Sequence, residues 1–338
     1  MIHTDVIIVG GGPAGSACAR RLLRSGIKCL VIDRREFPRA KSCAGWITPA
    51  VVKELELDPS EYPHGFTTSR ALTVCFRKFT VTLSNHQHAI RRVEFDHWLL
   101  NRSGARVYEH TVKSIVQNGS GYVVDGEFAS RYLVGAGGTY CPVYRTVFSA
   151  DHPRTRGALI VGLEAEFAYP HGGDDCWLWF WKNLPGYAWY VPKAGGHVNV
   201  GVGAWAEALT SGGDHLKTHW EELVERLDQA GLVRQRAYRP GGHCYYLGQN
   251  LRAARKGNAF VAGDAAGLAT VDMGEGIGPA VRSGELAADA IARGGEYSVG
   301  SIPRYSQGMV LGKAVLAMIR TNTTRAHPAA FARGCQDR

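Results

Sequence analysis

The segment 5–35, DVIIVGGGPAGSACARRLLRSGIKCLVIDRR, constrains the fold of this chain more than any other. Its first apolar run is typical of a parallel strand that is buried on both faces. The glycines that follow have the spacing GxGxxG, and a helical stretch then ends near Gly26. A second apolar strand ends at Asp33, which completes a strand–helix–strand unit. The segment therefore predicts an α/β domain with a nucleotide site.

The residue types of this unit suit a dinucleotide. Gly10 permits a tight turn, Gly12 lets the backbone approach a pyrophosphate, and Gly15 lets the helix pack closely on the strand. The pyrophosphate would lie at the helix N-terminus, and Asp33 could accept hydrogen bonds from a ribose. Because the complete unit is present, we prefer this interpretation to a glycine-rich turn without a ligand. The predicted contacts are Gly10, Gly12, Ala14, Gly15, Asp33 and Arg34.

A second glycine-rich segment, at 257–294, indicates which dinucleotide is bound. It contains a short apolar strand, then Asp264, a loop and a helix that starts near Gly276. This arrangement resembles the second FAD signature of flavoproteins similar to p-hydroxybenzoate hydroxylase. The resemblance implies a Rossmann-type (GR2) FAD domain, with an inserted, mainly antiparallel β domain for substrate. It also implies FAD contacts at Gly263 and Asp264, and at the amides of Gly276 and Ile277, where the positive helix end would stabilise reduced flavin.

Two further segments continue the resemblance. IRRVEFDHWLL, at 90–100, resembles the superfamily's R-x-x-F-D-x-x-L helix start, which implies that Arg92 contacts the cofactor. ARVYEHTVKSI, at 105–115, resembles the strand that passes the adenine, with Val112 as a backbone contact. One position departs from the pattern, because Gly137 stands where aromatic hydroxylases carry an aspartate. The departure weakens a hydroxylase interpretation.

The segment 174–193, DDCWLWFWKNLPGYAWYVPK, concentrates seven aromatic residues between Trp177 and Tyr190. Its first tryptophans alternate, which predicts one strand face, and YAWYVP and HVNVGVG predict two further antiparallel strands. The aromatic residues could form a packed core, a lipid or partner surface, or the wall of a ligand cavity. We favour the cavity, because ligand sites are largely apolar and aromatic. The predicted cavity residues are Trp46, Trp177, Trp179, Trp181, Tyr187 and Trp189.

PGYAWYVP followed by VNVGVG resembles the Y-x-W-x-F-P…VGxG segment of the geranylgeranyl reductase family. AKSCAGWITP, at 40–49, resembles the Cys-Gly-Gly region of that family, with Cys43 beside the flavin and Ala44 in place of the first glycine. The resemblance implies an FAD-dependent oxidoreductase that reduces C=C bonds of an apolar, isoprenoid-like substrate by hydride transfer from flavin N5. Cys43 is the candidate catalytic residue, as proton source or substrate contact; the alternative is a small filler.

Two other functions stay open at this point. One is a flavin monooxygenase that hydroxylates an aromatic substrate with O2, and the other is a non-catalytic flavin redox sensor. Since the sequence holds a single dinucleotide unit, we expect FAD to receive electrons from a transient donor, either NAD(P)H or a small redox protein. The expected substrate is an apolar or aromatic small molecule.

Composition and charge restrict the classes of partner and the location that we expect. The net charge is +9, but the basic residues occur in scattered pairs, so we expect no nucleic acid partner. The eight cysteines lack metal-ligand spacing, so we expect no metal site. No signal peptide and no membrane-spanning run is recognised, so we expect a cytoplasmic protein, with peripheral membrane contact left open.

The order of these segments predicts a discontinuous domain organisation. At 338 residues, the chain exceeds the size at which one hydrophobic core usually stops growing. We assign residues 1–69, 91–150 and 251–338 to the FAD-binding domain. Residues 70–90 and 151–250 then form the substrate-binding domain.

Overall fold

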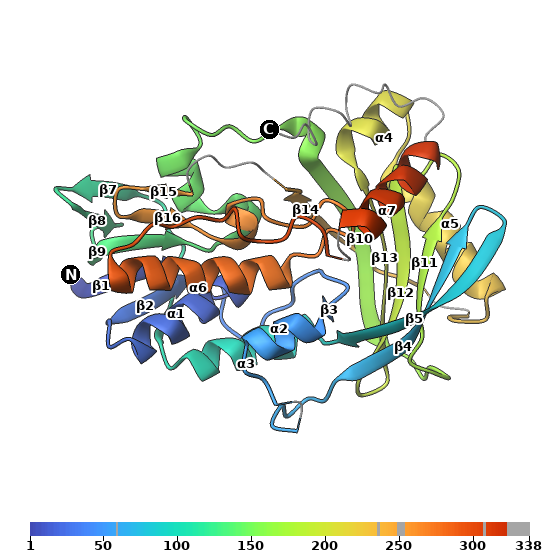
Figure 1. Ribbon diagram of the computed structural model, residues 1–338, viewed down its shortest axis with the longest axis horizontal. Helices are drawn as coiled ribbons and strands as arrows, with labels where there is room; N and C mark the ends of the chain where they lie inside the picture. Colours follow the sequence, from blue (N-terminus) through green and yellow to red (C-terminus); the bar gives the residue numbers. More distant parts are fainter. Residues whose placement is uncertain (59, 235–236, 249–253, 307–308, 323–338) are drawn as a thin grey trace. The chain divides into compact units, whose positions relative to one another are not determined.

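The computed structural model describes residues 1–58, 60–234, 237–248, 254–306 and 309–322 (Figure 1). The chain forms two compact units, each built from separated segments. The first unit contains residues 1–40, 93–154 and 245–306. The second contains residues 41–92 and 155–244 together with the described residues near the C-terminus. Each unit is organised around its own sheet.

The sheet of the first unit has a parallel centre. β1 pairs in parallel with β2 and β9, β2 pairs with β6, and β9 pairs with β16. The central strands are apolar on both faces, as expected for a parallel sheet covered on both sides. Its strands are β1 (Ile2–Val9), β2 (Cys29–Asp33), β6 (Arg106–Glu109), β7 (Ile115–Asn118), β8 (Gly121–Val124), β9 (Phe128–Gly135), β15 (Arg255–Lys256) and β16 (Ala259–Val261). This is the predicted Rossmann-type α/β arrangement.

Helices α1 (Pro13–Arg24) and α6 (Ile277–Arg293) pack against each other in this unit, and α3 (Arg92–Ser103) precedes β6 (Figure 1). Small residues make the α1–α6 contact close. A Cβ at Gly284 would lie only 2.1 Å from the Ala14 carbonyl oxygen. The unit also has the short helical turns η1 (Gly138–Tyr140), η2 (Tyr144–Phe148) and η4 (Gly263–Ala265).

The second unit is built on an eight-stranded sheet in the order β14-β10-β13-β12-β11-β4-β5-β3. The strand pairs with a described register are antiparallel except β11 with β4. The strands are β3 (Trp46–Ile47), β4 (Thr67–Phe76), β5 (Phe79–Ala89), β10 (Leu159–Ala168), β11 (Cys176–Phe180), β12 (Gly186–Lys193), β13 (His197–Trp205) and β14 (Gly241–Tyr246). Its helical segments are α2 (Pro49–Glu54), η3 (Arg156–Ala158), α4 (Ala206–Gly212), α5 (Leu216–Gln229) and α7 (Met309–Asn322).

Alternation along the strands gives this sheet two faces with different roles. One face, here called the α5 face, buries Ala188, Val200 and Val202 in a cluster with Leu223 and Leu227 of α5. Successive side chains of a strand point to opposite sides of the sheet, so the neighbouring residues project from the other side. This second side is called the opposite face.

Apart from shifts of a few residues at the other boundaries, the observed units differ from the predicted domains at two places. Residues 41–69 belong to the second unit, because β3 and β4 pair with β5, and β4 also pairs with β11. Helix α7, assigned to the FAD domain from sequence, also belongs to the second unit, where it contacts β11. Strand pairing of this kind joins segments far apart in sequence, and no local pattern in residues 41–69 announces it.

Candidate functional site

The loop between β1 and α1 has the close backbone contacts that its glycine spacing predicts. Gly10 has a φ of +113°, and a Cβ there would lie 2.4 Å from the Ala136 carbonyl oxygen. A Cβ at Gly15 would lie 1.9 Å from the Gly10 carbonyl oxygen. Neither position can hold a side chain without moving the backbone, so both glycines are required by the loop itself.

The N-terminus of α1 is open to a ligand. Gly12 is the N-cap residue, no side chain caps the helix, and its first turn contains no acidic residue. A Cβ at Gly12 would meet only the Arg39 guanidinium, at 3.6 Å. Ala14 is buried in the first turn of the helix. Unpaired backbone N–H groups and the positive end of the helix dipole fit a pyrophosphate at this place.

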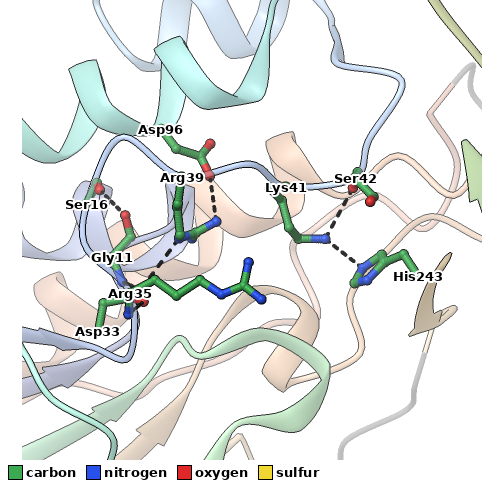
Figure 2. A network of polar contacts seen from close by, with 9 residues as sticks. All are labelled: Gly11, Ser16, Asp33, Arg35, Arg39, Lys41, Ser42, Asp96 and His243. Atoms are coloured by element: carbon green, nitrogen blue, oxygen red, sulfur yellow. Dashed lines mark hydrogen bonds and ion pairs between the residues drawn. The ribbon is translucent and has the colours of Figure 1, made fainter. Parts of the chain in front are cut away.

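Asp33 is held beside this loop by backbone donors. The Gly11 N–H donates to Asp33 Oδ2 at 2.8 Å, and the Arg35 N–H donates to Oδ1 at 3.1 Å (Figure 2). The Ser16 hydroxyl donates to the Gly11 carbonyl at 3.0 Å and so ties the loop to α1. The carboxylate at the end of β2 is therefore fixed where a ribose would need an acceptor.

Arg39 was not named by the sequence analysis, yet it contacts the same loop. Its Nε lies 4.0 Å from Asp33 Oδ2, and its Nη1 lies 3.6 Å from Asp96 Oδ2 on α3 (Figure 2). Asp96 is fully buried, and the Arg39 guanidinium also lies over the Phe37 ring at 4.5 Å. By contrast, the predicted contact Arg34 is exposed. The cation beside Gly12 is therefore Arg39.

Two more predicted cofactor residues occupy ordered positions. Arg92 is buried and is the first residue of α3. Val112 is buried in the loop between β6 and β7. This loop is organised by Asp125, which accepts hydrogen bonds from the backbone N–H groups of Lys113 and Ser114, at 3.1 and 2.6 Å. The Val112 side chain thus packs in the core, and the hydrogen bonds to Asp125 fix the backbone that follows it.

The second glycine-rich segment forms a compact turn between β16 and α6. Gly263 has a φ of +59°, and its N–H donates to the Ser283 hydroxyl at 2.8 Å. A Cβ at Gly276, the N-cap of α6, would lie 3.3 Å from Asp264 Oδ1. Ile277 is the first residue of α6 and is buried. The predicted residues therefore lie together at one helix start.

Arg154 anchors this turn from the side. It donates to the Ala265 carbonyl at 2.9 Å and also to the Thr139 carbonyl, and its guanidinium lies 3.9 Å from the centre of the Tyr144 ring. No sequence motif marks Arg154, because its partners are backbone carbonyls that only the fold brings near.

Glu275 is a third residue that no sequence motif predicted, after Arg39 and Arg154. Its carboxylate accepts a hydrogen bond from the Gly278 N–H at 2.6 Å, inside the first turn of α6. The pKa of the Glu275 carboxyl is raised to about 7, mainly by burial and also by the nearby Asp272 and Asp264, with the Gly278 hydrogen bond opposing them. A carboxyl group that titrates near neutral pH therefore lies at this helix start.

The structure corrects half of the predicted cavity wall. Trp177 and Trp179 stack on each other at 5.6 Å and project from the α5 face, and the Trp181 ring donates to His219 of α5 at 3.2 Å. Trp179 and Trp181 are only 4% and 5% exposed. Trp179 and Trp181 therefore belong to the hydrophobic core, and the partly buried Trp177 packs against it. In addition, β11 ends at Phe180, so Trp181 lies outside the strand.

The remaining aromatic residues of the prediction lie on the other side of the sheet. Tyr187 and Trp189 project from the opposite face, with ring centres 5.9 Å apart. The Trp189 ring donates to Asn199 Oδ1 at 2.7 Å and occupies the space that a Cβ of Gly201 would need. Trp46 packs in the same small cluster as Trp189. This face therefore keeps three of the predicted residues.

Two glutamates of β10 give the opposite face its polar groups. Glu164 Oε1 accepts a hydrogen bond from the Cys43 N–H at 2.5 Å. Glu166 pairs with Lys193 Nζ at 2.5 Å and with Arg91 Nε at 3.1 Å, and Lys193 is fully buried. Neither glutamate nor Lys193 was named from sequence, since their alternation along β10 and β12 carries no distinguishing motif.

The two carboxyl groups have opposite proton affinities. Burial raises the pKa of the Glu164 carboxyl, and the nearby Lys193 reverses this only in part. Burial also acts to raise the pKa of Glu166, but its ion pairs with Lys193 and Arg91 outweigh that effect and hold it below the ordinary value. The pair therefore contains one carboxyl that retains its proton more readily and one that is firmly ionised.

The segment that carries Cys43 is fixed by its own backbone. The Gly45 N–H donates to Cys43 Sγ at 3.3 Å. Gly45 has a φ of +74°, and a Cβ there would lie 2.1 Å from the Ile90 carbonyl oxygen. Next to it, Lys41 Nζ contacts His243 Nε2 at 2.6 Å and donates to the Ser42 carbonyl at 3.3 Å (Figure 2). These contacts hold the backbone on both sides of the Cys43 thiol.

Comparisons with known proteins agree with this reading. Residues 3–56 match the family model described as an FAD binding domain. The menaquinone reductase of Mycolicibacterium smegmatis is 30% identical over 332 residues, which cover 88% of this chain and 78% of that protein. Digeranylgeranylglycerophospholipid reductase 2 of Methanosphaera stadtmanae is 26% identical over 340 residues, which cover 90% of this chain and 82% of that protein.

A solved structure shows the same fold. A geranylgeranyl bacteriochlorophyll reductase-like protein from Thermoplasma acidophilum aligns with a TM-score of 0.75 at 21% identity, over 99% of this chain and 87% of that one. The fold, the glycine-rich loop and the matching FAD model together define an FAD-dependent oxidoreductase. Within that class, the chain belongs to the geranylgeranyl reductase-like family, which the similarity to the menaquinone reductase and to the digeranylgeranylglycerophospholipid reductase shows. Among the described residues, no helix is long and apolar enough to cross a membrane.

Proposed function

We propose that this protein reduces carbon–carbon double bonds in an apolar, isoprenoid-like lipid. The observation that carries the proposal is the opposite face of the second unit, where aromatic rings adjoin a fixed cysteine and a glutamate pair. The names of two relatives, which specify menaquinone and a digeranylgeranyl phospholipid, support a lipid substrate. The FAD group, when bound, would supply hydride in its reduced form.

The first unit would hold FAD through the residues described above. The amides near Gly12 would bind the pyrophosphate, and Arg39 would balance its negative charge. Asp33 would accept hydrogen bonds from the ribose. The remaining proposed contacts are Gly10, Ala14, Gly15, Arg34, Arg92, Val112, Gly263, Asp264, Gly276 and Ile277.

The second unit would bind and orient the substrate. Trp46, Tyr187 and Trp189 would provide the apolar wall, in place of the six residues first predicted. Cys43 would donate a proton to the carbon of the double bond that does not receive the hydride, or contact the substrate, while Glu164 holds the Cys43 backbone in position. These groups are half-buried, and a bound apolar substrate would cover them and exclude water from the reaction.

Electrons would come from NAD(P)H or from a small redox protein. The sequence contains one strand–GxGxxG–helix unit, and FAD would occupy it. A donor would therefore bind transiently. Anaerobic titration with NADH, NADPH and a reduced ferredoxin, followed through the flavin absorbance, would identify which donor the enzyme accepts.

Product analysis tests the proposed reaction. The FAD-loaded enzyme, with dithionite as reductant and no oxygen, is incubated with menaquinone and with a geranylgeranyl lipid. The proposal expects a product whose mass has increased by two hydrogens for each bond reduced. Unchanged lipids, together with oxygen uptake matched by hydroxylation of an aromatic compound in air, would contradict it and favour a monooxygenase.

A further inference from the structure

The hairpin formed by β4 and β5 carries an unusual apolar stripe. Phe79, Val81 and Leu83 are 77%, 52% and 42% exposed. They alternate along β5, so all three project from the same side of the strand. Large apolar side chains that gather in one exposed row, rather than singly, mark an interaction surface.

The register connects this stripe to the proposed substrate face. Phe79 pairs with Phe76 of β4, and Val81 pairs with Val74. Phe76 and Val74 pair in turn with Phe180 and Leu178 of β11, and Leu178 pairs with Trp189 of β12. Paired residues share a face, so the stripe is the exposed edge of the opposite face.

The hairpin itself carries charge of one sign. The hairpin, residues 67–89, has three basic residues and no acidic residue, which gives a formal charge of +3. Arg70, Arg77 and Lys78 are exposed on the hairpin. The Arg77 guanidinium is held close to the stripe, since it donates to the Thr321 carbonyl at 2.6 Å and lies over the Phe76 ring at 5.4 Å.

We propose that this hairpin docks onto the surface of a bilayer that contains anionic phospholipid. Phe79 and Val81 would enter the region between headgroups and acyl chains, and the basic side chains would contact phosphate groups. The charge favours this partner over a second copy of the chain, because a symmetric contact would bring two hairpins of +3 together. The proposal extends the proposed function, since a lipid substrate would reach the opposite face along the same stripe.

Vesicle sedimentation tests the docking without any need for turnover. The full chain, loaded with FAD, is mixed with phosphatidylcholine vesicles that contain or lack phosphatidylglycerol. The proposal expects binding that increases at least about tenfold with phosphatidylglycerol and weakens with salt. Equal binding to both vesicle types, or none to either, would overturn the proposal.

Paired variants locate the surface. Phe79→Ser with Val81→Ser, and separately Arg70→Glu with Lys78→Glu, should each lower binding at least about tenfold. Val116→Ser is the apolar control, since Val116 is 59% exposed on β7 of the first unit. Lys217→Glu is the charge control, because Lys217 lies on α5, with a side chain that is 83% exposed. If the two control variants lose as much vesicle binding as the hairpin variants, the docking surface does not lie on the hairpin.

Two further readouts separate the alternatives. Phe79 and Val81 are exposed, so the melting temperature should stay within the range of the controls. If the variants change the oligomeric state but not vesicle binding, the stripe is a contact between copies and the proposal is wrong. Turnover of a lipid dispersed in detergent tests the proposed function without any need for membrane docking. If the protein binds vesicles but does not reduce the dispersed lipid, the proposed function is wrong and the docking proposal still stands.

Discussion

Glu164 and Cys43 are joined by a hydrogen bond of 2.5 Å from the cysteine N–H to the glutamate Oε1. The carboxylate therefore fixes the backbone of the cysteine and leaves the thiol for other partners. Gly45 supports the same turn through its N–H contact with Cys43 Sγ. This geometry makes Glu164 a positioning residue for the candidate catalytic thiol.

Replacement of Glu164 separates positioning from charge. Glu164→Gln keeps an oxygen acceptor for the Cys43 N–H, whereas Glu164→Leu removes it. We expect the Leu variant to lose kcat by about a hundredfold with little change in KM, because a small displacement of a reacting group is costly. The Gln variant should keep most activity and a normal rate of Cys43 alkylation. Equal losses in both variants, with unchanged alkylation, would remove the positioning role.

The two faces of the second sheet predict different effects for two tryptophans. Trp179→Ala removes a ring from the core and should lower the free energy of unfolding by about 3–5 kcal/mol with KM unchanged. Trp189→Ala should raise the KM for the lipid at least about tenfold, with a smaller effect on stability. Denaturant titration and steady-state kinetics distinguish these effects. A Trp179 variant that binds substrate poorly but unfolds normally would reverse the assignment.

These faces show where sequence reasoning reached its limit. Alternation correctly indicated that Trp177 and Trp179 share a face, but it could not say whether a helix covers that face. The answer depends on α5, whose segment follows more than thirty residues later and packs there through Leu223 and Leu227. Sequence alternation thus predicted the strands, and only the tertiary packing decided between core and cavity.

The close backbone contacts of the glycines before α1 predict that one added methyl group causes loss of the cofactor. Gly15→Ala places a methyl group against the Gly10 carbonyl and must displace the helix start. We expect purified protein with little bound flavin and a free energy of unfolding lower by about 1–3 kcal/mol. Gly295→Ala is the control, since no atom lies within 4 Å of a Cβ there. A Gly15→Ala protein with full flavin absorbance would contradict the assigned pyrophosphate site.

This loop was predictable because its requirements are local. The spacing of Gly10, Gly12 and Gly15 and the position of Asp33 follow from one short strand–helix–strand unit. Arg39 was not predictable in the same way, because its partner Asp96 comes from α3, far along the chain. The fold brings these charges together, and no spacing in the sequence reports it.

Glu275 predicts a dependence of stability on pH. Its pKa in the folded protein is about 7, above the ordinary value, so the folded state favours the protonated carboxyl. The stability it contributes is complete below the unfolded pKa and is lost as pH rises through about 7, a change of about 3 kcal/mol. Glu275→Gln keeps the acceptor for the Gly278 N–H but does not ionise.

Denaturant titrations at about pH 5 and about pH 8 check this sign. The free energy of unfolding of Glu275→Gln, relative to the unmodified protein, should be higher at the higher pH by about 3 kcal/mol. Glu127→Gln, an exposed acid in the same unit, is the control and should show no such difference. A Glu275→Gln protein that tracks the unmodified protein at both pH values would show that Glu275 is ionised throughout.

The most direct test of the central claim is a single-turnover reaction. The FAD-loaded protein is reduced with dithionite without oxygen, and a geranylgeranyl lipid is then mixed in while the flavin absorbance is followed. The account predicts reoxidation of the flavin in a stoichiometric ratio to the double bonds lost, slowed in Trp189→Ala. Flavin that stays reduced with every isoprenoid lipid, and reoxidises only when oxygen is admitted, would contradict it.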